Sequence, residues 1–127
     1  MPNSVILVFF GGALGAILRE LVMLIVPNLA DGFPLDILVA NLLAAFVLGF
    51  VSALHSRNAA SDSVNMFAGT GICGGLSTFS SFAFGMAVLT RASTASAVVA
   101  VVYMVVSLVL GYIAVGFGLK LGGKRLA

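Results

Sequence analysis

The sequence is poor in charge, has a single cysteine and lacks tryptophan. Only 8% of its 127 residues are charged, whereas soluble domains carry roughly 25%, so the composition excludes an ordinary water-soluble domain. Cys73 cannot form an intrachain disulfide, and its apolar, glycine-rich surroundings favour a small packing residue. The six lysines and arginines form no basic run, which argues against a nucleic-acid partner despite the net charge of +2.

Apolar residues, in contrast, make up 61% of the chain. They form four runs of at least about 20 residues, the length that crosses a bilayer, at about residues 4–26, 35–54, 64–89 and 95–119. The first run stops at Pro27, and the last ends in GGKR, where glycines end a helix and cations meet its negative end. We therefore expect an all-α membrane protein, one transmembrane domain over residues 1–127 within the lipid bilayer, and no enzyme.

The third run is unlike an ordinary helix, because GTGICGGLSTFSSFAFG is rich in glycine and hydroxyl residues. Gly74 and Gly75 lower helix propensity, and the hydroxyls of Ser77 and Thr78 compete with the backbone hydrogen bonds. A break near residues 74–78 is predicted, and the carbonyls that it frees must face protein, an ion or water. The alternative is that the glycines are packing contacts between helices and the hydroxyls bond to their own turn.

Other polar and aromatic side chains follow the apolar runs. Phe79 and Phe82 stand at i and i+3, so their electropositive ring edges can line a path for a small anion, although such rings more often face lipid or core. Asn41 is a candidate ligand, and an interhelical hydrogen bond that fixes register is an equal alternative. Tyr103 and Ser107, at i and i+4, add a further polar stripe.

The charges near the first run leave two interpretations open. Arg19 can attract anions at a pore mouth or play a structural part, and Glu20 stands beside it. The central parts of the four runs carry no carboxylate, lysine or histidine, so a proton relay is absent and passive conduction is favoured. His55 falls in a polar island, where a solvated side chain is expected.

Three segments resemble the CrcB, or Fluc, family of bacterial fluoride channels. They are GGALGAILRE at 11–20, DILVANLLAAFVLGF at 36–50 and, most specifically, GICGGLSTFSSF at 71–82, and the resemblance covers essentially the whole chain. It implies a passive, fluoride-selective channel in the bacterial inner membrane. It also implies a dual-topology homodimer, in which two antiparallel copies form two fluoride pores along their interface.

The resemblance also implies roles for particular residues. Phe79 and Phe82 would line the pores with the second-run Asn41, and hydroxyls would form a polar track for fluoride. The full set of implied pore residues is Asn41, Thr78, Phe79, Ser81, Phe82, Tyr103 and Ser107. The backbone carbonyls of Gly74 and Ser77, from both subunits, would hold a structural sodium ion. The family commonly has threonine in place of Ser77, but a carbonyl ligand does not depend on the side chain.

Two other classes of protein compete with this interpretation. Small multidrug exporters are also dual-topology dimers of four-helix chains, but they exchange protons through a membrane-embedded carboxylate, for which Glu20 is the only candidate. A scaffolding subunit without transport would have unbroken, uniformly apolar third and fourth runs, which the composition of the third run argues against.

Overall fold

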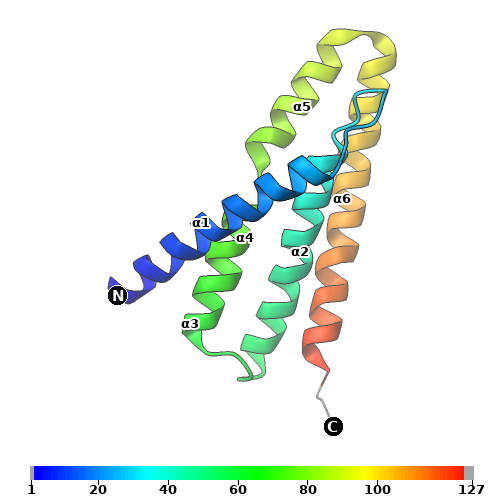
Figure 1. Ribbon diagram of the computed structural model, residues 1–127. Helices are drawn as coiled ribbons and strands as arrows, with labels where there is room; N and C mark the ends of the chain where they lie inside the picture. The colour runs from blue at the N-terminus through cyan, green and yellow to red at the C-terminus, as the bar shows by residue number, and fades with distance from the viewer. Residues whose placement is uncertain (1, 125–127) are drawn as a thin grey trace.

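The computed structural model describes residues 2–124, and every regular element within them is helical (Figure 1). Residue 1 and residues 125–127 of the expected domain lie outside the described residues. The elements are α1 (Pro2–Ile25), α2 (Leu35–Ser56), α3 (Asp62–Val64), the π-helix η1 (Asn65–Ile72), α4 (Cys73–Leu76), α5 (Phe79–Ala92) and α6 (Thr94–Gly123).

Four stretches are long and apolar enough to cross a membrane. They run over Asn3–Ile25, Leu35–Ser56, Asp62–Ala92 and Thr94–Gly123. The third of these combines α3, η1, α4 and α5, and we call it the third span. The expectation of an all-helical chain with four membrane-capable helical stretches is thereby confirmed.

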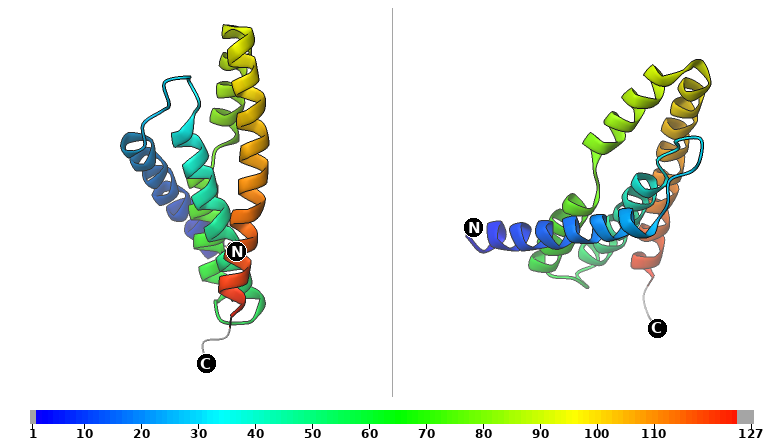
Figure 2. Two further views of the ribbon diagram at one scale, coloured as in Figure 1. Left: turned by 90° about the vertical axis from the view of Figure 1, so that its right-hand side faces the viewer. Right: turned by 45° about the horizontal axis from the view of Figure 1, so that its top comes forward.

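Helices α2 and α6 lie side by side along most of their length (Figures 1 and 2). Glycines bring the two backbones together: a Cβ at Gly49 would overlap the carbonyl oxygen of Val115, and one at Gly118 would overlap that of Phe46. Small residues allow this approach between membrane helices, where dispersion contacts replace the hydrophobic effect as the driving force.

Helix α1 crosses the first part of the third span at a steep angle (Figure 1). A Cβ at Gly71 would come within 2.9 Å of the Gly11 Cα, and one at Gly75 would overlap the carbonyl oxygen of Gly12. Cys73 is buried and free, and it packs with Ala40, as expected for a small packing residue. This crossing fixes α4 against α1.

The third span changes direction between α4 and α5. Helix α4 ends at Leu76, and Ser77 and Thr78 have extended backbone with ψ angles of 153° and 115° before α5 begins. Figure 2 shows α5 leaning away from α4 and returning to α6 through a tight connection. Gly74 and Gly75 lie within α4, so their low helix propensity did not interrupt the helix at those positions.

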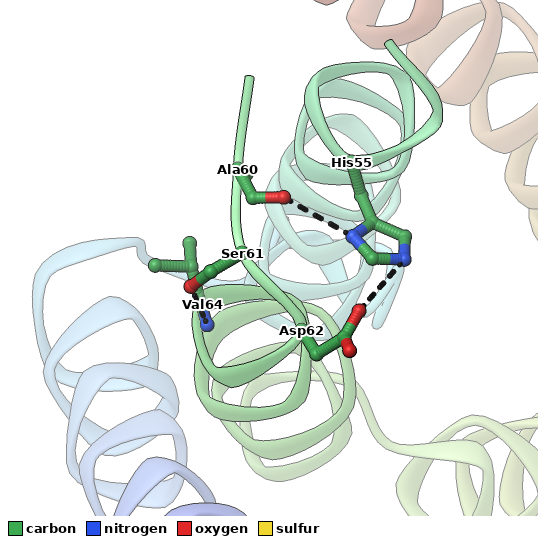
Figure 3. A network of polar contacts seen from close by, with 5 residues as sticks. All are labelled: His55, Ala60, Ser61, Asp62 and Val64. Carbon is green, nitrogen blue, oxygen red and sulfur yellow. Dashed lines mark hydrogen bonds and ion pairs between the residues drawn. The ribbon is translucent and has the colours of Figure 1, made fainter. Parts of the chain in front are cut away.

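A small polar network precedes the third span (Figure 3). His55 Nδ1 lies 3.2 Å from the carbonyl oxygen of Ala60, and His55 Nε2 lies 3.6 Å from Asp62 Oδ1. The backbone N–H of Val64 donates to the Ser61 hydroxyl over 3.3 Å, which caps α3. His55, expected as a solvated side chain, instead joins the end of α2 to the start of the third span.

Candidate functional site

Polar atoms gather where the third span is interrupted. The Thr78 backbone N–H donates to Asn41 Oδ1 over 2.7 Å, and Asn41 Nδ2 donates to the Thr78 carbonyl over 3.2 Å. Two backbone groups that leave the helical ladder are thus paired by one side chain. Asn41 therefore fixes the extended segment to α2. The second proton of its amide group is not used in these two hydrogen bonds.

Thr78 also organises a group of three hydroxyls, which we call the hydroxyl cluster: Thr78, Ser80 and Ser81. The Ser81 N–H donates to Thr78 Oγ1 over 3.1 Å, so Thr78 caps α5. The Thr78 hydroxyl donates to Ser81 Oγ over 3.0 Å and lies 3.3 Å from Ser80 Oγ. The cluster lies at the positive end of the α5 macrodipole, which favours an anion.

Phe79 and Phe82 line a hollow of about 240 Å³ together with Asn41, Ser77 and Thr78. We call it the phenylalanine hollow. The centroids of the two rings are 6.0 Å apart, with an angle of 32° between the ring planes. The Phe79 ring is 80% exposed, whereas the Phe82 ring is partly buried. The two rings and the amide of Asn41 therefore meet at one place.

Tyr103 and Ser107 supply buried hydroxyls from α6. Tyr103 is fully buried, with its ring 5.1 Å from that of Phe82 and 5.2 Å from that of Phe33. The hydroxyl oxygens of Tyr103 and Ser107 are buried and have no hydrogen-bond partner among residues 2–124. An unpaired buried hydroxyl costs about 1–3 kcal/mol, so these groups indicate a place for water or an ion.

Gly74 and Ser77 lie on a second hollow of about 370 Å³, which we call the glycine hollow and which Asn41 and Thr70 also line. The Thr78 N–H turns to Asn41 and so no longer serves the Gly74 carbonyl one turn earlier. A Cβ at Gly74 would meet nothing within 4 Å, so the backbone is open here. Carbonyl oxygens in an open position can hold a hard cation.

The part of the chain that the structure describes contains no group of three or more His, Cys, Asp or Glu able to hold a metal. A metal site among these residues would therefore depend on backbone oxygens. Arg19 is partly buried on α1 and lines neither the phenylalanine hollow nor the glycine hollow. Glu20 is exposed on the same helix.

Sequence reasoning missed one residue of this region. Asp36, the second residue of α2, is only 7% exposed, and its Oδ1 accepts from the Ile37 N–H over 2.8 Å. It lines a third hollow of about 880 Å³ together with Ser80 and Ser81 of the hydroxyl cluster. A carboxylate directly after FPL, at the start of an apolar run, was the available signal.

Comparisons with known proteins agree with the three motifs. The family described as CrcB-like protein, Camphor Resistance (CrcB), matches residues 6–119. The chain is 52% identical over 125 residues to a protein of Yersinia pseudotuberculosis named fluoride-specific ion channel FluC 3, covering 98% of this chain and 92% of that protein. It is 37% identical over 124 residues to a FluC protein of Ignicoccus hospitalis, covering 98% of each.

A relative from Brucella melitensis, named fluoride-specific ion channel FluC 2, is 54% identical over 124 residues. That match covers 98% of this chain and 46% of the relative, so the chain spans about half the length of this Brucella protein. The motif resemblance therefore extends over nearly the whole of the chain.

Proposed function

The chain belongs to the CrcB family, and on this premise we propose that it forms a fluoride-selective channel through which the anion leaves the cell passively. One observation carries the proposal: Asn41, the hydroxyl cluster and two phenylalanine rings lie close together at one interruption of a membrane span. All these groups are neutral. They can replace part of a hydration shell without trapping the ion, as conduction requires.

Each group has a role along the proposed path. The free amide proton of Asn41 and the hydroxyl proton of Ser81 donate to the anion, aided by the positive end of α5, and Thr78 positions Ser81 by donating its own hydroxyl proton to Ser81 Oγ. Phe79 and Phe82 present electropositive ring edges to it. The unpaired hydroxyls of Tyr103 and Ser107 extend the track along α6 and gain a partner when the ion passes.

The working unit in this proposal is a dual-topology homodimer with two pores, in the inner membrane of a bacterium. Two features support a second copy. The Phe79 ring is 80% exposed beside polar backbone, and the open backbone at Gly74 needs a partner because lipid cannot satisfy carbonyl oxygens. An inverted copy would cover both features.

The same proposal includes a structural sodium ion at the dimer centre, held by the backbone carbonyls of Gly74 and Ser77. The residues fit such an ion, since both line the glycine hollow and the Gly74 carbonyl has lost its helical donor. Carbonyl oxygens suit a hard cation, and the ion would supply positive charge that ties the two copies together. In this proposal the sodium ion is structural, and the pore residues of the chain bind and orient the fluoride ion.

Fluoride efflux from liposomes tests the proposal. Purified protein is reconstituted, the vesicles are loaded with fluoride or with chloride, and the membrane potential is clamped before efflux is recorded. Fluoride should leave rapidly while chloride remains, with protein-free vesicles as the control. Equal loss of the two anions would exclude a fluoride-selective channel.

The alternative of a small multidrug-type, proton-coupled exporter gains no support. The relatives are named ion channels, and Glu20, the carboxylate that the sequence offers to an exporter, is exposed on α1. In the same vesicles, Glu20→Gln should leave fluoride efflux intact.

A further inference from the structure

Asp36 is a buried carboxylate without a cation. It is 7% exposed, and the bond that its side chain accepts comes from the adjacent Ile37 N–H. The only ion pair among residues 2–124 joins His55 to Asp62, at the other end of α2. Burying a charge without a cationic partner is costly, and the positive end of α2 offsets only part of that cost.

The hollow beside Asp36, which we call the acidic hollow, leads to the hydroxyl cluster. Its lining includes Asp31 from the connection before α2, Asp36 itself, and Ser80 and Ser81 from α5. Ser81 accepts the hydroxyl proton of Thr78, so one wall of the hollow belongs to the proposed fluoride path. The described residues that line it include no lysine, arginine or histidine.

Asp31 is the other charged residue among those that line the acidic hollow. The connection before α2 contributes Asp31, which is exposed, and α5 and α6 contribute hydroxyl and apolar side chains. On α2 the carboxylate lies five residues before Asn41, a rise of about 7.5 Å along the helix axis. Five residues also turn the helix by about 140°, so Asp36 and Asn41 lie on different faces of α2, and the charge acts on the path across the acidic hollow, where Ser80 and Ser81 form part of the lining.

We propose that Asp36 is a permeation-determining residue, whose carboxylate lowers the occupancy of the fluoride path by repelling the anion from the acidic hollow. The inference rests on the proposed channel function. Repulsion of this kind keeps binding weak enough for release, which rapid conduction needs. Because the charge repels all anions alike, it changes the fluoride concentration at which the path fills and leaves the discrimination against chloride unchanged.

The test compares Asp36→Asn with the unaltered chain in fluoride-loaded liposomes, at fluoride concentrations well below saturation. Asparagine keeps the shape and the acceptor for the Ile37 N–H but removes the charge. Efflux should rise on the order of tenfold, with a matching fall in the half-saturating fluoride concentration. The ratio of fluoride to chloride efflux should stay constant.

Three further variants separate charge from structure. Asp36→Glu keeps the charge and should behave like the unaltered chain, and Asp36→Ser, whose hydroxyl oxygen can also accept from the Ile37 N–H, should reproduce the rise. Asp31→Asn is the matched control: Asp31 lines the same hollow and accepts from the Phe33 N–H, but it is exposed. Its removal should change efflux less than twofold, because water and salt screen it.

The outcomes distinguish the two proposals. An unchanged or reduced efflux in both Asp36→Asn and Asp36→Ser, beside normal fluoride efflux of the unaltered chain, overturns the role of Asp36 alone. An effect of equal size in Asp36→Glu also overturns it, because that result assigns the effect to shape. An unaltered chain that moves no fluoride overturns both the channel function and this inference.

Discussion

The two halves of the third span differ in what they contact. The first half, from α3 to α4, packs against α1 and α2, whereas the second half, α5, packs mainly against α6. Gly71, Cys73 and Leu76 are buried in the first half, and Leu89 is the buried residue of α5. Close packing therefore ends at residues 77–78, where the polar groups begin.

This difference indicates how a membrane span can accommodate polar groups. The first half is fixed to α1 by contacts between backbones, which tolerate no added atoms. The second half borders the acidic hollow and touches the connection before α2 through side chains such as Pro34. We call the first half the rigid half and the second half, α5, the open half. The two halves meet at Thr78, whose freed backbone groups are paired by Asn41.

The largest effect is expected for Gly75→Ala. Its Cβ would overlap the Gly12 carbonyl oxygen and lie 2.8 Å from the Ala16 nitrogen, so two backbones must separate. We expect the free energy of unfolding to fall by about 3 kcal/mol or more, as measured by thermal unfolding in detergent.

Gly85→Ala is the matched control in the open half. Its Cβ would lie 3.2 Å from Pro34 Cγ, a side-chain atom, and alanine favours the helix by about 1 kcal/mol. The unfolding temperature should therefore change little. Equal losses in the two variants would contradict the contrast between a rigid half and an open half.

A second effect, on fluoride efflux as well as on stability, is expected for Asn41→Leu. Leucine has the same number of side-chain heavy atoms as asparagine but leaves the Thr78 N–H and carbonyl without their partner, at a cost of about 1–3 kcal/mol for each group. Fluoride efflux should fall by at least tenfold in liposomes, because the extended segment loses its attachment to α2. Asn28→Leu, at an exposed position before α2, is the control and should keep normal efflux. Normal efflux in Asn41→Leu would remove Asn41 from the path.

Much of the fold was predictable because it depends on local composition. The four apolar runs correspond to the four spans, and the hydroxyl and glycine content predicted a break at residues 74–78, of which Ser77 and Thr78 are extended. The sodium ligands, the fluoride track and the inverted dimer remain predictions, because they depend on a second copy and on ions.

Other features depend on contacts between residues far apart in sequence. Gly75 was assigned to a break, but it serves packing against Gly12, more than sixty positions earlier. Asp36 stands at the start of an apolar run, but its place in one hollow with α5 and the connection before α2 depends on residues far apart in sequence. The backbone of the π-helix η1 likewise contacts α1, where Gly11 lies against Gly71, sixty positions later.

The smallest effects concern the residues that cap the two halves. Thr78 caps α5 at a buried position, and Ser61 caps α3 at an exposed one. Thr78→Val removes the hydroxyl at nearly constant volume and should lower the free energy of unfolding by about 2 kcal/mol. Ser61→Ala should lower it by about 0.5 kcal/mol, since water replaces the lost acceptor. Thr78→Ser should restore most of the loss. Equal losses of unfolding free energy in Thr78→Val and Ser61→Ala would mean that water reaches the interruption as freely as it reaches the surface. The neutral donors at the interruption would then compete with water for the anion and could not replace its hydration shell.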